Sequence, residues 1–183
     1  MIFTETSLPG SYIIEMVPFT DDRGWFARMF CKKEFAAIGH SKEWVQINHS
    51  YTAHKGVIRG MHFQKPPYTE IKLVHCITGT IFDVIIDVRQ GSPTFLHWFG
   101  VELSRGNKKM LYIPEGFAHG FQTLEDHCEL LYCHSNFYTP GYEGAILFND
   151  PKIKINWPME ATYLSDKDKQ ITLVNEDFKG IKF

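Results

Sequence analysis

Residues 56–72 carry three side chains that could act on a charged substrate. Arg59, His62 and Lys72 supply a guanidinium, an imidazole and an ammonium within this stretch. A guanidinium binds phosphate or carboxylate through a fixed fork of donors, and a histidine can exchange a proton near neutral pH. Together they predict a site that holds an anionic substrate and moves a proton. A lone histidine in a strand is more often structural, so the pattern by itself leaves the role of His62 open.

The same stretch has the alternation of a β-strand. Side chains on a strand point in turn to two opposite faces. We therefore expect His62 to share a face with Ile58 and Gly60, and Arg59 to point to the other face.

Further polar residues interrupt apolar or aromatic patterns elsewhere in the chain. A buried Arg or Lys needs a partner, which is either an internal carboxylate or an anionic ligand. For any one of these residues an internal ion pair or a surface position is the commoner explanation. Several together, with no excess of carboxylates nearby, favour a ligand that carries phosphate. The set comprises Arg23, Gln46, Asn48, Arg59, His62, Lys72, His119, Tyr132 and Tyr138.

The composition predicts one globular domain over residues 1–183. Hydrophobic residues make up 44% of the 183, enough to bury a sizeable core. A formal net charge of −2 offers no basic excess, so we expect neither nucleic acid nor a membrane as partner. The four cysteines are scattered without a CxxC pair, and the N-terminus has no signal-peptide pattern. We therefore expect reduced thiols in a cytoplasmic protein.

Short β-rich runs separated by turn residues predict an all-β fold. We expect strands over residues 12–17, 25–30, 44–50, 70–78, 80–89, 95–103, 109–113, 120–124 and 129–136, besides the central stretch. Residues 32–38 are compatible with a short peripheral helix that ends at Gly39. Many short strands at ~8–12-residue spacing are typical of a sandwich or barrel, and a double-sheet jelly roll suits this length best.

A jelly roll can also hold a metal ion. Such a site needs three or four His and carboxylate ligands, commonly with two histidines close in sequence. His62 has no histidine two or four residues away, and His119 has no acidic residue after it until Glu125. We expect no metal, and a metal-dependent cupin enzyme stays open as an alternative.

Motifs along nearly the whole chain carry a family resemblance. They include RGMHFQ at 59–64 and IPEGFAHGF at 113–121. The others lie at 22–24, 45–50, 72–74, 79–89, 92–94, 101–104, 131–132, 138, 143–144, 149–151, 157–158 and 164–168. In this order they resemble the nucleotide-sugar 3,5-epimerase family.

The resemblance implies a cupin-type double-stranded β-helix and a homodimer that exchanges N-terminal strands. It also implies a cofactor-independent isomerase acting on a nucleotide-diphospho 4-keto-6-deoxy sugar. The expected context is deoxysugar biosynthesis for surface polysaccharide, such as dTDP-rhamnose for the O-antigen of lipopolysaccharide. A double inversion at C3 and C5 is the default, and a single-centre epimerase or a non-catalytic sugar-nucleotide binding module are the alternatives.

The resemblance also assigns the catalytic residues. His62 corresponds to the base that removes a proton beside the ketone, and Asp168 to the carboxylate that orients it. Lys72 corresponds to the cation beside the ketone oxygen, and Tyr132 to the proton donor on the opposite face of the sugar.

The same comparison assigns the substrate-binding residues. Those matched to nucleotide-diphosphate and sugar contacts are Arg23, Gln46, Asn48 and Arg59, and other ligand contacts fall on His119, Tyr138, Glu143 and Lys167. Arg28 stands at the nucleotide end, where thymidine-specific members usually carry Glu, and Ile47 stands where they carry Asp. A CDP- or GDP-linked sugar is therefore an alternative to a dTDP-linked one.

Overall fold

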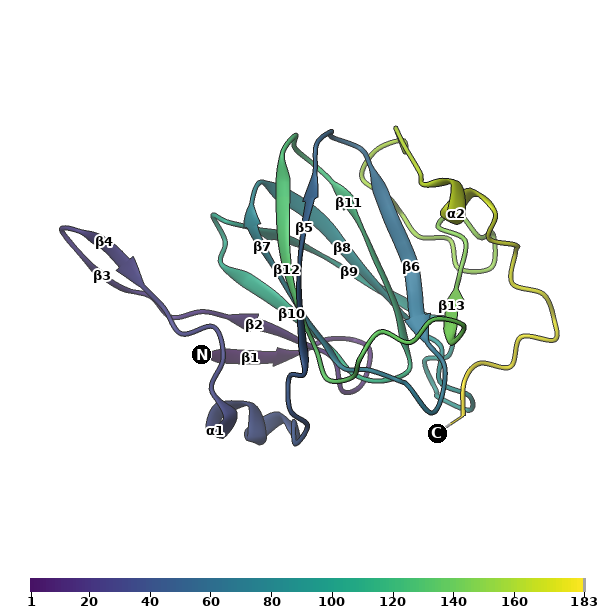
Figure 1. The fold of residues 1–183 in the computed structure, drawn as a ribbon, viewed down its shortest axis with the longest axis horizontal. Helices are drawn as coiled ribbons and strands as arrows, with labels where there is room; N and C mark the ends of the chain where they lie inside the picture. The colour runs from purple at the N-terminus through teal and green to yellow at the C-terminus, as the bar shows by residue number, and fades with distance from the viewer. Residues whose placement is uncertain (183) are drawn as a thin grey trace.

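The computed structural model describes residues 1–182 and consists mainly of short strands (Figure 1). The first strands are β1 (Ile2–Glu5), β2 (Tyr12–Glu15), β3 (Phe19–Asp21), β4 (Gly24–Phe26), β5 (Gln46–Thr52), β6 (Ile58–Gln64) and β7 (Lys72–Thr78). The later ones are β8 (Thr80–Asp87), β9 (Trp98–Ser104), β10 (Lys109–Ile113), β11 (Phe117–Thr123), β12 (Cys128–His134) and β13 (Glu143–Ala145). The helical segments are α1 (Lys32–Phe35), the 3₁₀ turn η1 (Ala36–Ile38) and α2 (Asp166–Lys169).

Two antiparallel sheets form the body of the molecule. One has the strand order β1-β2-β10-β7-β12-β5 and the other β13-β6-β11-β8-β9. Strands that are distant in sequence are neighbours in each sheet, as in a jelly roll. The predicted all-β, cupin-type jelly roll with short peripheral helices is confirmed.

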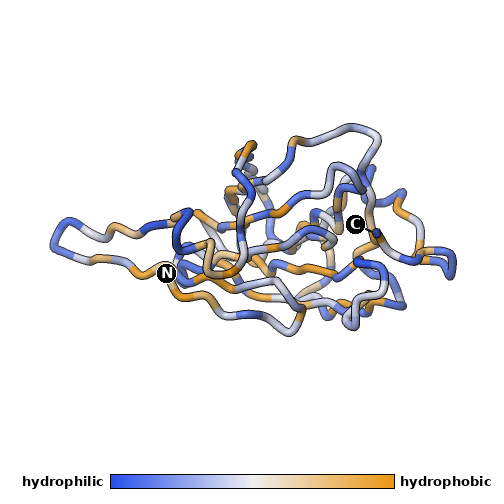
Figure 2. The backbone as a smooth tube through the Cα atoms, turned by 90° about the horizontal axis from the view of Figure 1, so that it is seen from below, coloured by the Kyte–Doolittle hydropathy of each residue, from blue (hydrophilic) through white to orange (hydrophobic). Residues whose placement is uncertain are grey.

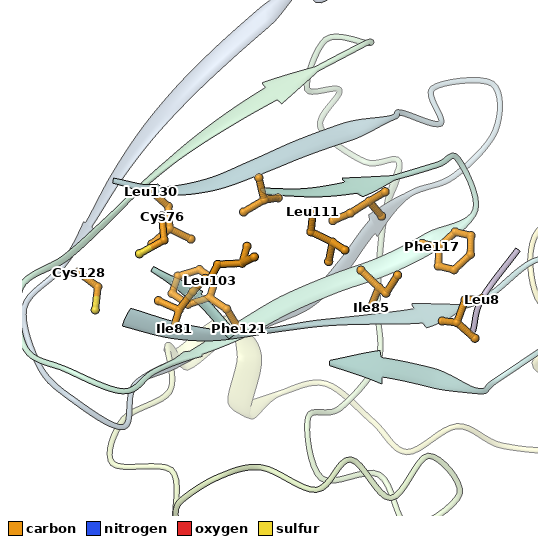
Figure 3. Close-up of a cluster of buried hydrophobic side chains, with 12 residues drawn as sticks. Leu8, Cys76, Ile81, Ile85, Leu103, Leu111, Phe117, Phe121, Cys128 and Leu130 are labelled. Carbon is orange, nitrogen blue, oxygen red and sulfur yellow. The ribbon is translucent and has the colours of Figure 1, made fainter. Parts of the chain in front are cut away.

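The main core lies between the two sheets (Figure 3). Val74 and Leu111 come from one sheet, and Ile81, Ile85 and Phe121 come from the other; all are fully or almost fully buried. Because alternate residues of each strand point inward, the inner faces supply most of this cluster.

The outer faces of both sheets are covered as well. Phe35 of α1 packs with Leu73 and Met110 on the outer face of the six-stranded sheet. Residues of the chain after β13, including Ile146 and Ile153, pack on the outer face of the five-stranded sheet. This covering explains why several strands have few exposed positions.

The β3–β4 hairpin extends away from the two sheets (Figures 1 and 2). Phe19 and Phe26 pair across it and are 75% and 73% exposed. An exposed pair of large apolar side chains is typical of a surface that meets another molecule.

Most predicted elements are present with shifted ends. The 32–38 helix forms as α1 and η1 and ends at Gly39, whose φ of 81° is left-handed, as expected of a helix end. The strand predicted over 25–30 is wrong beyond Phe26, and β11 begins at Phe117 instead of Gly120. One domain over 1–183 stays a prediction, and residue 183 lies outside the described residues. Among residues 1–182, no helix is long and apolar enough to cross a membrane.

Candidate active site

An extra residue in β6 brings Arg59 and His62 to the same cavity. His62 pairs with His119 and Arg59 pairs with Phe121, so β6 spans one more residue than β11 between the two pairs. Such a β-bulge reverses the alternation of side chains beyond it. Arg59 and His62 both line one cavity, and the prediction that they face opposite ways is wrong.

Two glycines allow this bulge. A Cβ atom on Gly60 would stand 2.5 Å from the Cα atom of Gly120 on the neighbouring strand, and Gly60 has a φ of 134°. Neither the space nor the dihedral suits an L side chain. The close approach therefore depends on glycine at both positions.

The cavity opens between the two sheets and has a volume of about 420 Å³. The six-stranded sheet lines it through β5, β7 and β12, the five-stranded sheet through β6 and β11, and residues 163–168 complete it. An adjoining cavity of about 800 Å³ shares part of its wall. The residues common to both are Asn48, His62, Lys72, His134 and Lys167.

His62 and Asp168 form a hydrogen-bonded pair. The Nε2 atom of His62 lies 2.6 Å from Oδ1 of Asp168, which is buried, while His62 is partly open to the cavity. Ser165 caps α2 and fixes Asp168 by accepting its backbone N–H. Burial opposes ionisation of Asp168, but the hydrogen bond from His62 outweighs it and the carboxyl pKa is lowered. A charged Asp168 accepts a hydrogen bond from the N–H at Nε2, so the neutral ring of His62 carries its lone pair on Nδ1.

Lys72 approaches the cavity beside a buried carboxylate. Its Nζ atom lies 3.3 Å from Oε1 of Glu70, and Oε2 of Glu70 lies 2.7 Å from Nδ1 of His134. Burial acts to raise the pKa of Glu70, yet the hydrogen bond from His134 and the charge of Lys72 lower it overall. The carboxylate is therefore charged and holds the ammonium.

Tyr132 lines the same cavity from the six-stranded sheet, across from His62 on the five-stranded sheet. Its hydroxyl lies 3.1 Å from the hydroxyl of Ser50, and burial raises the pKa of the phenol. The phenol thus keeps its proton at neutral pH. His119 stands edge-on to the Tyr132 ring and bonds through Nε2 to Asp83 at 2.8 Å.

Tyr138, Glu143 and Lys167 meet at the rim of the adjoining cavity. The Tyr138 hydroxyl donates to Glu143, and Lys167 lies 3.2 Å from the same carboxylate oxygen. The hydrogen bond from Tyr138, the backbone N–H of Gly141 and Lys167 together lower the pKa of Glu143 to about 2. A ligand entering here would meet a linked set of polar side chains.

Arg59, Asn48 and Gln46 supply further polar groups along the cleft. Arg59 donates to Oγ1 of Thr52 at 3.1 Å and to the carbonyl of Tyr51 at 3.2 Å. Among the residues described, Arg59 forms no ion pair with a carboxylate. Part of its guanidinium is thus available to an anionic ligand. Gln46 donates to Asn48 at 3.2 Å.

Two predicted substrate contacts lie elsewhere in this chain. Arg23 sits at the turn of the β3–β4 hairpin, pairs with Asp21 at 2.6 Å and has a side chain 90% exposed. Arg28 follows the hairpin and pairs with Glu34 of α1 at 2.7 Å. Neither lines the two cavities described above.

Several polar residues that line or support the site were given no role from the sequence, among them Ser50, Glu70, His134, Tyr163 and Ser165. Ser50 and His134 stand two positions along a strand from Asn48 and Tyr132, and residues two apart on a strand share a face, so this spacing could have identified them. Glu70 precedes β7, and Tyr163 and Ser165 lie outside the named strands, so no such spacing marks these three. Within residues 1–182, no group of three or more His, Cys, Asp or Glu side chains is arranged to hold a metal ion.

The fold is that of a cupin-type jelly roll, and its cavity brings together a carboxylate-paired histidine and a buried phenol, a pair suited to proton transfer. Comparison with known proteins agrees and is more specific. The chain belongs to the dTDP-4-dehydrorhamnose 3,5-epimerase family, whose model matches residues 5–176.

Individual relatives match along most of their length. The dTDP-4-dehydrorhamnose 3,5-epimerase of Shigella flexneri is 48% identical over 165 residues, which cover 90% of this chain and 91% of that protein. The Bacillus anthracis dTDP-4-dehydrorhamnose 3,5-epimerase structure, with TDP and PPi bound, is 40% identical with a TM-score of 0.91, covering 94% and 99% of the two chains. The Legionella pneumophila epimerase in complex with dTDP-4-keto-L-rhamnose is 37% identical, also with a TM-score of 0.91, covering 98% and 97%.

Proposed function

We propose that this chain inverts C3 and C5 of a dTDP-linked 4-keto-6-deoxy sugar, with His62 as base and Tyr132 as acid. The observation that carries the proposal is the shared cavity: His62 from one sheet and Tyr132 from the other line the same space. A sugar ring between them would meet a base on one face and a proton donor on the other. The dTDP sugar is supported by the names and ligands of the family members that this chain resembles.

The reaction needs only proton transfer. Hydrogens on C3 and C5 lie beside the C4 ketone, so removing one leaves an enolate whose charge rests on the ketone oxygen. Returning a proton to the opposite face inverts the carbon. A positioned base, an acid and a donor to the oxygen are sufficient for such chemistry.

The hydrogen bonds at His62 suit it to act as the base. Asp168 accepts a hydrogen bond from the N–H at Nε2 at 2.6 Å, which leaves the lone pair of Nδ1 available. After proton abstraction the imidazolium is stabilised by the adjacent carboxylate, as the carboxylate of a catalytic triad does.

Tyr132 and Lys72 complete the set. Burial raises the pKa of Tyr132, so the phenol holds a proton until the enolate carbon takes it. Lys72 lies in the wall of the same cavity, where its ammonium can bind the charged ketone oxygen. A donor in this role typically lowers the activation free energy by ~3 kcal/mol.

Arg59 suits the diphosphate of the substrate. It lines the cavity, and its two donations go to neutral oxygens of Thr52 and Tyr51. A guanidinium with unused donors favours a phosphate oxygen.

We also propose that the chain works as a cytoplasmic homodimer in deoxysugar synthesis for surface polysaccharide. The exposed Phe19 and Phe26 of the β3–β4 hairpin support pairing, because a second copy would cover them. If the two copies exchange their N-terminal strands, Arg23 and Arg28 would also come within reach of a ligand. Light scattering tests this: a dimer is expected for the wild type, and a monomeric wild type would contradict the proposal.

Solvent exchange tests the chemistry. We expect the protein to introduce deuterium at C3 and C5 of a dTDP-4-keto-6-deoxy sugar in heavy water, followed by NMR. His62→Ala should abolish exchange at both carbons, whereas His49→Ala, at a partly exposed histidine outside the cavity, should leave it intact. Parallel assays with CDP- and GDP-linked sugars test the nucleotide. Exchange at one carbon alone would indicate a single-centre epimerase, and binding without exchange would indicate a binding module.

A further inference from the structure

A chain of hydrogen-bonded side chains runs from Lys72 through the wall of the cleft. Lys72 pairs with Glu70 at 3.3 Å, and Glu70 bonds to Nδ1 of His134 at 2.7 Å. Nε2 of His134 lies 3.3 Å from Nδ2 of Asn48, and Oδ1 of Asn48 accepts from Nε2 of Gln46 at 3.2 Å. The first three side chains are only 10%, 9% and 11% exposed.

The partners along this chain fix its protonation. Nδ2 of Asn48 can only donate, so Nε2 of His134 accepts and carries no proton. The proton of the neutral ring therefore sits on Nδ1 and is donated to the Glu70 carboxylate. Oε1 of that carboxylate faces the Lys72 ammonium. The hydrogen bonds from Asn48 to His134 and from His134 to Glu70 therefore run in one direction.

We propose that Glu70 and His134 are positioning residues for Lys72, which hold its ammonium where the C4 ketone oxygen of the substrate gains charge. This inference rests on the proposed function and adds two residues to it. Lysine has a long flexible stem, and its ammonium would otherwise sample several positions. Glu70 draws it to one place, and His134 in turn keeps the Glu70 carboxylate from rotating.

The effect should appear in catalysis more than in binding. The ketone oxygen carries full negative charge only in the enolate. A misplaced ammonium therefore reduces the stabilisation of the transition state more than it reduces the stabilisation of the bound substrate. Removing an oxyanion donor outright costs ~10²–10³ in kcat. Misplacing the donor should cost less, and we expect about tenfold.

Glu70→Gln is the direct test, because the amide keeps the shape and loses the charge. We expect kcat to fall about tenfold while KM changes by less than about threefold. The matched control is Glu129→Gln. Glu129 pairs with His49 at 2.8 Å, also between a carboxylate and a histidine, but away from both cavities. It should retain the wild-type kcat.

His134 provides a second variant in case Glu70→Gln folds poorly. His134→Asn can keep an N–H near the position of Nδ1, whereas His134→Ala cannot. We expect His134→Ala to lower kcat about tenfold and His134→Asn to restore most of it. Equal losses in the two variants, with unchanged thermal unfolding, would overturn the role given to His134.

A double-mutant comparison separates positioning from a merely structural role. If Glu70 acts through Lys72, Glu70→Gln should change kcat by less than about twofold in a Lys72→Ala background. A further tenfold loss there would overturn the inference. An active wild type whose Glu70→Gln variant keeps full kcat also overturns it while leaving the proposed function intact. A wild type without solvent exchange overturns both.

Discussion

Nε2 of His62 lies 2.6 Å from Oδ1 of Asp168, although 106 positions separate the two residues in sequence. The contact joins β6 to α2, and the capping hydroxyl of Ser165 accepts the backbone N–H of Asp168. It decides which imidazole nitrogen carries a proton, and therefore which one can act as a base.

Asp168→Asn should lower kcat strongly. The amide can offer an N–H to the ring nitrogen and so favour the wrong tautomer, a change that costs ~10⁴ in kcat in a serine protease. We expect a loss of at least about 10²-fold in steady-state kinetics, with little change in substrate affinity by calorimetry. Asp166→Asn, an exposed position on the same helix, is the control and should behave as wild type. A tenfold loss in affinity with normal kcat would contradict the assigned role.

Tyr132→Phe should separate the two proton transfers. The base remains, so deuterium exchange should persist in part, whereas inversion should fall by about 10²-fold or more because the acid is missing. NMR in heavy water measures both in one sample. If exchange and inversion fall equally, Tyr132 is not the acid of the second step.

Arg59→Ala should weaken substrate binding with a smaller effect on turnover. A phosphate contact is present in both the bound substrate and the transition state, so its loss raises KM. We expect KM to rise about tenfold or more and kcat to stay within about threefold. Arg105→Ala, at an exposed arginine outside the cleft, should leave both constants unchanged. A reversed pattern, with kcat falling at constant KM, would give Arg59 a catalytic role instead.

Gly60→Ala should destabilise the fold. The new methyl group would meet the backbone of Gly120 at 2.5 Å, and the φ of 134° disfavours any side chain. Denaturant unfolding should show a loss of roughly 2–4 kcal/mol. Gly91→Ala also places a side chain at a left-handed φ, but in open space, and should cost about 1 kcal/mol. Similar losses at both positions would mean that the contact with Gly120 is unimportant.

Stability should fall as the solution becomes acidic, and Asp87 should contribute to this. The buried carboxylate accepts from Arg89, Ser92 and Thr94; burial acts to raise its pKa, but these donors lower it overall. A lowered folded pKa gives stability that is present above the unfolded value of ~3.9 and lost as pH falls toward the folded value. Urea unfolding between pH 7 and pH 3 should show a shallower pH dependence for Asp87→Asn than for wild type. Parallel curves for the two proteins would exclude this contribution.

The sequence predicts the architecture well because strand alternation and turn residues are local signals. β10 runs over 109–113 as expected. The short helix ends at Gly39 because glycine adopts the left-handed φ of a helix end without steric strain. The sequence could not predict that Arg59 and His62 lie on the same side of β6, because the bulge between them depends on how β6 pairs with β11. Local patterns do not report a contact between strands.

The site was predictable in part. The pairing of His62 with Asp168 came from family resemblance and not from spacing, because a partner on a distant helix leaves no periodic signal. Arg23 and Arg28 lie on or beside the projecting hairpin, and no property of the single chain brings them to the cleft. His134 was detectable through its two-residue spacing from Tyr132 on β12, whereas Glu70 precedes β7 and leaves no such signal.

The location of Asp168 on α2 separates the tautomer of His62 from the pairing of the strands. His62, Lys72 and Tyr132 lie on strands that all precede α2, whereas the carboxylate that orients the imidazole belongs to a helical turn outside both sheets. A change confined to α2 can therefore alter which nitrogen of His62 carries the proton while the strands that line the cavity keep their pairing.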